Sequence, residues 1–364
     1  MKYVIQKNSS APAYLQLYIQ IREDIISQLY PYGSKLPSKR LTADELDIST
    51  VTVEHAYALL CDEGYAEAVE RSGYFVIFRA DDGFASFSDK SDKSNAQTNT
   101  DISVSESFPF SVLTKTMRGV MSDCGEAILN KSPNAGCAEL REAIRQYLAR
   151  SRGIICKTKQ IIIGSGAEYL YSLIVELLGR DKIYAVESPS YKQIEQVYRM
   201  SDVRYRMLPL GSDGIESAAL QRTDADVLHI TPYRSFPSGV SASASKRHEY
   251  IRWAEKKDSF IVEDDFESEF SVSKKPEETL FSHTSSDNVI YMNTFSKTVS
   301  SSFRTGYMVL PLDLACEFEE KLGFYSCTVP TFIQIVLAEL ITNGDFERHI
   351  NRVRRKKRKE MQGK

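Results

Sequence analysis

The sequence predicts two domains in one chain: a winged helix-turn-helix at residues 1–79 and an α/β domain with a mostly parallel sheet at residues 106–364. Three observations predict this organisation. The first region carries three helical patterns followed by two short alternating segments. Residues 80–105 are rich in Ser, Asp, Asn and Lys and poor in large apolar residues, which is typical of a flexible linker. From about Phe108 onward helical and strand patterns alternate, which favours parallel strands joined by helices.

The composition is that of an ordinary multidomain globular protein. The chain has 364 residues, of which 42% are hydrophobic, and a formal net charge of −3. No global positive field draws it to nucleic acid, so any DNA contact must come from a local basic face. We expect no signal peptide and no membrane contact, because apolar runs of the required length are absent from the sequence. Six scattered cysteines are typical of reduced thiols in a cytoplasmic protein.

The first domain has the pattern of a helix-turn-helix. Apolar residues from Tyr14 to Leu29 recur on one helical face. A second helix is expected over about 38–46, with Ser38 as its N-cap. The third helix is expected to begin near Ser49 and end at Gly64, and its small polar N-terminus favours entry into the major groove of DNA.

Candidate DNA contacts follow from this arrangement. Thr50, Thr52 and His55 face outward on the third helix and are placed to meet the groove. Phosphate contacts are expected from the second helix and the hairpin, whose turn contains Gly73: Lys39, Arg40 and Arg71. A three-helix module that binds protein is the alternative that the pattern leaves open.

The ordered pattern of the first domain resembles the winged helix of GntR-type bacterial repressors. The resemblance is carried by LPSKRLTADELDISTVTVEHAYALL (36–60) together with SGYFV (72–76). It implies operator DNA as a partner. This chain has Thr50 where the family usually has an arginine after the serine that opens the recognition helix.

The second domain contains short β-branched segments that are typical of buried strands. They lie at 159–164, 182–187, 226–231, 259–264, 288–293 and 305–310. Helical patterns over 137–151 and 167–179 fall between some of them. Ligands of an open α/β sheet bind beyond the carboxyl ends of its strands, so polar residues after these strands are the candidate site.

Each candidate alone has an ordinary interpretation. Gly164, Ser165 and Gly166 precede a helix that begins near Ala167, which is either a tight turn or an anion site made by free N–H groups. Tyr191 is either packed or stacked on a heterocycle, and Lys297 alone is a solvated lysine. Adjacent carboxylates follow another strand, but with no His or Cys beside them we expect no metal: Glu263, Asp264 and Asp265.

Together these residues fit pyridoxal 5′-phosphate. A lysine amine forms a Schiff base with the aldehyde of this cofactor. A carboxylate facing the ring nitrogen keeps that nitrogen protonated, so the ring can accept electrons. An arginine, present here as Arg304 seven positions after Lys297, holds a phosphate by charge-assisted hydrogen bonds.

Residues 106 to about 360 resemble the large domain of fold-type I aminotransferases. With the winged helix, the chain is similar to the MocR/GabR branch of GntR regulators. The carrying segments are NTFSKTVSSSFRTGY (293–307), VEDDFESEF (262–270), ESPSY (187–191) and GSGAE (164–168). The resemblance implies that Lys297 forms the internal aldimine, that Asp264 faces the pyridinium and that Tyr191 stacks on the ring. It also implies a set of phosphate and hydroxyl contacts: Ser165, Gly166, Ala167, Arg304, Thr294 and Ser296.

The chain departs from the family pattern at several positions. Phe266 stands where the family has a tyrosine that donates to the ring oxygen, and Phe236 stands where classical aminotransferases have an asparagine. Asn130 replaces a tyrosine of the subunit interface. Residues 344–364 resemble the helix that leads into a small C-terminal domain, and we expect either a truncated or a degenerate member.

The resemblance implies a homodimeric, cytoplasmic transcriptional regulator that binds operator DNA and pyridoxal 5′-phosphate. An amino-acid or amine effector would react at the internal aldimine. Two alternatives remain open. One is a pyridoxal-phosphate-dependent aminotransferase with an appended DNA-binding domain, with weak or no turnover. The other is a degenerate member that binds DNA without a cofactor.

Overall fold

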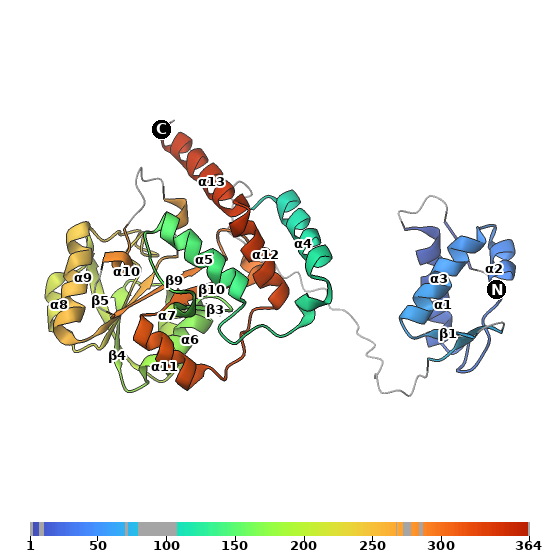
Figure 1. The fold of residues 1–364 in the computed structure, drawn as a ribbon, viewed down its shortest axis with the longest axis horizontal. Helices are drawn as coiled ribbons and strands as arrows, with labels where there is room; N and C mark the ends of the chain where they lie inside the picture. Colours follow the sequence, from blue (N-terminus) through green and yellow to red (C-terminus); the bar gives the residue numbers. More distant parts are fainter. Residues whose placement is uncertain are drawn as a thin grey trace. The chain divides into compact units, whose positions relative to one another are not determined.

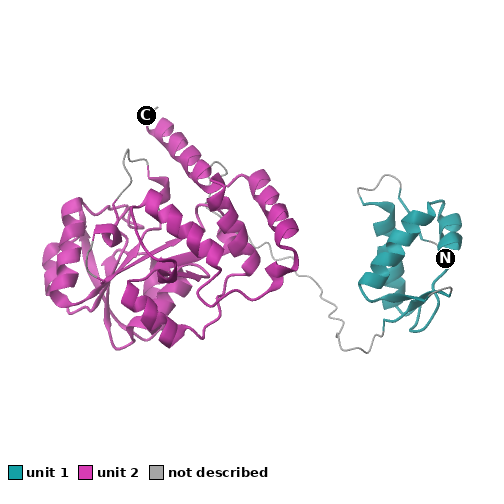
Figure 2. Ribbon diagram, viewed as in Figure 1, with its two compact units in different colours: residues 1–98 teal, residues 99–364 magenta. Residues whose placement is uncertain are grey.

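The structure is a computed structural model that describes residues 3–6, 11–69, 72–78, 108–266, 268–271, 278–283 and 287–362. The chain divides into two compact units, residues 1–98 and residues 99–364 (Figure 2). Each unit is described by itself. The expected linker at 80–105 and the candidate phosphate contact Arg71 lie outside the described residues.

The first unit consists of three helices and an antiparallel hairpin, as the sequence predicts. Ser38 and Ser49 cap the second and third helices, because their hydroxyls accept hydrogen bonds from the backbone N–H groups of Leu41 and Thr52. Asp47 ends the second helix in the left-handed conformation and makes the tight turn. The elements are α1 (Ala13–Ile26), α2 (Lys39–Leu46), α3 (Thr50–Asp62), β1 (Ala66–Val69) and β2 (Gly73–Val76).

The core of the first unit forms between α1 and α3. Leu17, Ile21 and Ile25 of α1 are buried with Val53 and Leu60 of α3. The expected continuation of the first helix to Leu29 is wrong. α1 ends at Ile26 because the chain leaves the helical conformation at Gln28, whose φ is +63°, and the side chain of Leu29 is 64% exposed.

The second unit is an α/β domain built on an eight-stranded sheet (Figure 1). The strand order is β3-β10-β9-β8-β7-β4-β5-β6. Neighbouring strands from β9 through β5 are parallel, whereas β10 runs antiparallel to both β3 and β9, and β6 antiparallel to β5. The strands are β3 (Ile161–Gly164), β4 (Ile183–Ser188), β5 (Arg204–Gly211), β6 (Gly214–Ile215), β7 (Val227–Ile230), β8 (Phe260–Asp264), β9 (Val289–Thr294) and β10 (Gly306–Val309).

The mostly parallel sheet confirms the predicted fold class, but β5 and β6 were not predicted. β5 lies near the sheet edge, and most of its residues are exposed or half-buried. The strand contains Arg204, Arg206 and Pro209, which interrupt its apolar residues. It therefore lacks the continuous apolar run by which a buried strand is recognised in a sequence.

Helices cover both faces of the sheet. Because successive side chains of a strand point to opposite faces, their contacts show which helices pack on which face. Ile161 and Ile163 of β3 pack with α5 and α12, whereas Ile162 packs on the opposite face with α6 and α11. None of the helices in the described part of the chain has the length and apolar character that a membrane crossing requires. The α-helices are α4 (Phe110–Cys124), α5 (Ala138–Ser151), α6 (Ala167–Leu178), α7 (Lys192–Met200), α8 (Ser217–Arg222), α9 (Ala244–Lys257), α10 (Leu280–His283), α11 (Leu312–Leu322), α12 (Thr331–Thr342) and α13 (Asp345–Gln362).

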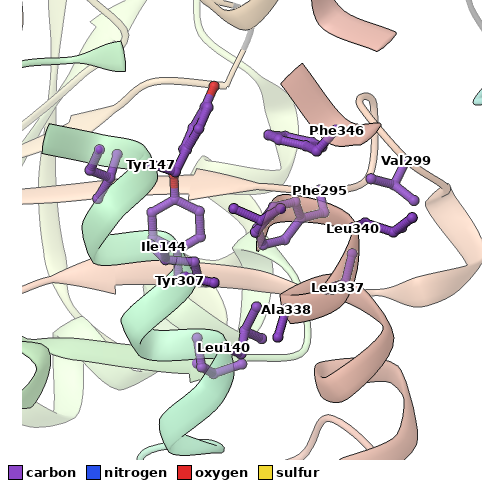
Figure 3. Close-up of a cluster of buried hydrophobic side chains, with 14 of the residues drawn as sticks. Leu140, Ile144, Tyr147, Phe295, Val299, Tyr307, Leu337, Ala338, Leu340 and Phe346 are labelled. Atoms are coloured by element: carbon purple, nitrogen blue, oxygen red, sulfur yellow. The ribbon is translucent and has the colours of Figure 1, made fainter. Parts of the chain in front are cut away.

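A large apolar cluster joins α5 and α12 to the sheet. Figure 3 shows Leu140 and Ile144 of α5 alongside Leu337 and Ala338 of α12, with Tyr307 of β10 in the same cluster. These side chains are wholly or almost wholly buried. The cluster therefore fixes the helices against β3, β9 and β10.

We expect Leu337→Ala to lower the free energy of unfolding by about 2–5 kcal/mol, because the deletion leaves a cavity in this cluster. The control substitution Met200→Ala removes a side chain that is 85% exposed. It should change the free energy by less than about 0.5 kcal/mol. Urea denaturation followed by circular dichroism measures both, and equal losses would contradict the core assignment.

Candidate functional site

A pocket lies at the carboxyl ends of the central strands of the second unit. Parallel strands end at one edge of a sheet, so residues distant in sequence meet there. The predicted residues Tyr191, Asp264 and Arg304 all line it. The complete lining is Ala167, Glu168, Tyr171, Tyr191, Ile194, Thr231, Phe236, Asp264, Phe266, Thr294, Ser296 and Arg304.

Asp264 ends β8 and is buried, with 3% of its surface exposed. Its Oδ2 accepts a hydrogen bond of 2.5 Å from the hydroxyl of Tyr171 and lies 3.8 Å from Nε2 of His229. Nδ1 of His229 is in turn 2.6 Å from the hydroxyl of Tyr198. The other oxygen of Asp264, Oδ1, has no hydrogen-bond partner among the residues that the structure describes.

Tyr171 remains a hydrogen-bond donor to Asp264. Burial, and then the charge of Asp264, raises the pKa of the Tyr171 hydroxyl well above its usual value. The proton therefore stays on Tyr171. Tyr171 thus holds the carboxylate of Asp264 through Oδ2. A buried acceptor without a hydrogen-bond partner is energetically costly, so Oδ1 is suited to accept a hydrogen bond from a ligand.

Aromatic rings frame the pocket. The rings of Tyr191 and Phe266 are nearly parallel, 19° apart with centroids separated by 6.4 Å, and Phe236 meets Tyr191 edge-on at 6.1 Å. Nζ of Lys297 lies 3.9 Å from the centroid of Phe266, within cation–π range. Lys297 follows β9 in the chain, so the predicted amine lies against a ring of the pocket wall.

The start of α6 supplies the other end of the pocket. Gly166 caps α6 with φ +95°, and a Cβ there would lie 2.8 Å from Nη2 of Arg304. Within the described chain this helix start has no side-chain cap, so the first-turn N–H groups are free to bind an anion. Arg304 itself has a left-handed backbone and pairs with Glu168 at 2.7 Å. Ser165 and Ala167 flank Gly166.

The remaining predicted hydroxyls lie beside these groups. Thr294 is the last residue of β9 and is buried, and Ser296 is half-buried. Both line the pocket. Six of the predicted cofactor residues therefore line the pocket: Ala167, Tyr191, Asp264, Thr294, Ser296 and Arg304. Ser165, Gly166 and Lys297 are not among its lining residues.

Four residues at or beside the pocket were not predicted: Glu168, Tyr171, Tyr198 and His229. Tyr171 lies in a helix whose nearly apolar sequence indicates burial alone, and His229 is a single histidine inside a buried strand. Glu168 was noted only as part of a turn. Their roles depend on contacts with residues far away in the sequence, which the spacing of apolar residues cannot predict.

The candidate DNA residues of the first unit lie on or beside α2 and α3. Thr50 and His55 are exposed on α3, and Arg40 is exposed on α2. Lys39 pairs with Glu54 of α3 at 2.7 Å, a contact that was not predicted. The hydroxyl of Thr52 is 2.8 Å from that of Ser49, and Gly73 starts β2 with φ +118°.

Fold and site define a helix-turn-helix domain joined to an aminotransferase-type domain. Residues 13–76 match the model of bacterial regulatory proteins of the gntR family, and residues 106–362 match aminotransferase class I and II. The HTH-type transcriptional regulator YdeL of Bacillus subtilis is 32% identical over 98% of this chain and 79% of its own length. The probable rhizopine catabolism regulatory protein MocR of Rhizobium meliloti is 27% identical over 97% and 76%.

Among solved structures, the kynurenine aminotransferase of Pyrococcus horikoshii matches with a TM-score of 0.61 and 26% identity, over 68% of this chain and 64% of that enzyme. The chain thus spans less than two thirds of that enzyme's length. The chain belongs to the MocR/GabR-type transcriptional regulators, in which a gntR-family DNA-binding domain is fused to an aminotransferase class I and II domain.

A buried carboxyl group joins strand β4 to the loop after β7 beside this site. Glu187 of β4 accepts a hydrogen bond of 2.5 Å from the hydroxyl of Ser235, the residue before Phe236. Burial raises the pKa of Glu187 to about 8. The folded protein therefore holds a proton on Glu187 at a pH where the unfolded chain has lost it.

This proton makes stability depend on pH. The contribution is complete below the ordinary glutamate pKa near 4.5 and is lost as the pH rises toward about 8. We expect Glu187→Gln, which keeps an acceptor for Ser235 but does not titrate, to lose less stability than the wild type between pH 5 and pH 8. Melting temperatures across this range test it, with the exposed Glu126→Gln as control. Parallel profiles for the wild type and Glu187→Gln would rule the effect out.

Proposed function

We propose that the second unit binds pyridoxal 5′-phosphate through Lys297 and senses an amino acid or amine, while the first unit binds operator DNA. We also propose residues 1–79 as the DNA-binding domain, 80–105 as the linker and 106–364 as the sensing domain. The single observation that carries the cofactor proposal is Oδ1 of the buried Asp264 in the pocket wall, for which the described part of the chain offers no hydrogen-bond partner.

The residues present fit this cofactor. A protonated pyridine nitrogen is the donor that Oδ1 of Asp264 lacks, and Tyr171 holds the other oxygen in place. Because Gly166 has no Cβ, the guanidinium of Arg304 can lie close to the start of α6, and the two groups together suit a phosphate. Tyr191 offers a ring face for stacking.

Pyridoxal phosphate, when bound, supplies an aldehyde that condenses with a primary amine. Lys297 provides such an amine next to Phe266. An amino-acid or amine effector carries the same group and therefore competes with Lys297. Release of Lys297 would change the contacts of the loop after β9, and the effector would shift the protein toward the conformation that it binds better.

We expect borohydride reduction of the protein with pyridoxal phosphate to attach the cofactor permanently to Lys297, because Lys297 forms the reducible link. Peptide mass spectrometry identifies the modified lysine. Lys297→Ala should lose the label, whereas Lys321→Ala, which removes a lysine paired with Glu317 on α11, should keep it. Labelling that is unchanged in Lys297→Ala would contradict the proposal.

The relationship to aminotransferases makes turnover the second candidate function. The sequence identity of 26% to an aminotransferase structure favours it, while the pocket presents Phe236 and Phe266, which bring no donor to the ring. Loss of an amino donor that depends on an added keto acid would identify an enzyme. Binding of the amino compound without such loss would identify a sensor.

For the DNA-binding unit, we expect Arg40→Ala to weaken binding of duplex DNA of any sequence. Log affinity falls as log salt concentration rises, and removing one phosphate contact should make this negative slope shallower by about 0.9. Fluorescence anisotropy with a labelled random duplex measures this slope. Arg118→Ala, which removes an exposed arginine of α4 in the second unit, is the control. An unchanged slope in Arg40→Ala would remove Arg40 from the interface.

We also propose a homodimer. Large apolar side chains remain exposed on α4 and the turn after it: Phe110, Met121 and Leu129. Exposed apolar side chains on consecutive elements are typical of an interaction surface. Light scattering of the full chain tests the dimer, and a monomer at all concentrations would contradict it.

A further inference from the structure

We propose that Glu168 is a built-in competitor for Arg304 and sets the affinity of the pocket for the phosphate of its cofactor. This proposal rests on the proposed cofactor. Glu168 would thereby be the residue that distinguishes a phosphorylated ligand from its unphosphorylated counterpart. Neither group would be an additional site, because both line the pocket already described.

The geometry places the competitor at the phosphate end of the pocket. Oε2 of Glu168 is 2.7 Å from Nη2 of Arg304. Both groups converge on Gly166: the position of a Cβ on that glycine would be 2.8 Å from Nη2 of Arg304 and 3.5 Å from Oε2 of Glu168. The ion pair therefore lies over the start of α6, where an anion would be bound.

The surroundings stabilise one anion there, and Glu168 is that anion. It lies in the first turn of α6, where the helix dipole and free N–H groups favour negative charge. Arg304 offers the opposite charge at the same place, because its guanidinium lies over Gly166. The carboxylate of Glu168 is thus stabilised by the same two groups that a phosphate needs, the N-terminus of α6 and the guanidinium of Arg304.

A phosphate that binds there must either separate Glu168 from Arg304 or lie beside the negative charge of Glu168. Like charges at such short range repel each other, and solvent screens this repulsion only in part, because the side chains of Glu168 and Arg304 are 35% and 55% exposed. The acid therefore weakens phosphate binding selectively. It leaves contacts to the ring and to the aldehyde, made by Asp264 and Lys297, unaffected.

The test is Glu168→Gln in the full chain, titrated with pyridoxal phosphate and with pyridoxal by absorbance. We expect the Kd for pyridoxal phosphate to fall about tenfold, as for removal of one like charge near the ligand. The Kd for pyridoxal should stay within about twofold. Inorganic phosphate should compete better in the variant.

The matched control is Glu176→Gln, which removes a Glu–Arg pair with Arg180 from the other end of the same helix. It should bind like the wild type. Glu168→Ser, which also lacks the charge, should reproduce the gain, so a folding defect of one variant does not decide the result.

Two outcomes overturn the inference. If the wild type binds pyridoxal phosphate and both Glu168 variants bind it equally well or more weakly, Glu168 is no competitor while the proposed cofactor stands. If neither the wild type nor the variants bind pyridoxal phosphate or inorganic phosphate, the competitor and the cofactor proposal fall together.

Discussion

The site depends on a buried carboxylate, Asp264, which within the described residues has a hydrogen-bond partner on Oδ2 but none on Oδ1. Tyr171 of α6 donates a hydrogen bond to Oδ2. Nε2 of His229 in β7 lies near the same oxygen, and the hydroxyl of Tyr198 contacts Nδ1 of that histidine. Three separate elements thus orient one acid at the end of β8. A buried charge is stable only when it is paired or hydrogen-bonded, so the free Oδ1 is the point where a ligand donor completes the structure.

A buried ionic network anchors the chain that follows this acid. Arg152, at the end of α5, lies 3.3 Å from Asp265 and 3.7 Å from Glu269, and Tyr291 of β9 donates to Asp265 at 2.7 Å. Arg354 of α13 donates to the backbone carbonyl of Glu269 at 2.5 Å. These contacts connect α5, β9 and α13 to the segment that carries Phe266, and therefore to the aromatic wall of the pocket.

Much of the fold could be predicted from the sequence, because the spacing of apolar residues indicates which segments form helices and which form strands. Capped helices such as α3, and buried strands such as β9, show their pattern directly. β5 was missed because a half-exposed strand that contains arginines shows no apolar run. In the site, residues directly after strands could be named in advance, since strand ends converge. Tyr171 and Glu168 could not, because the partners that give them a role, Asp264 and Arg304, are brought near only by the tertiary fold.

We propose that Oδ1 of Asp264 accepts a hydrogen bond from the protonated ring nitrogen of pyridoxal phosphate. The most direct measurement is the nitrogen-15 chemical shift of ring-labelled pyridoxal phosphate bound to the full chain at neutral pH. We expect the shift of a protonated pyridine in the wild type and of an unprotonated one in Asp264→Ala. An unprotonated ring nitrogen in the wild type, or the same shift in both proteins, would contradict it.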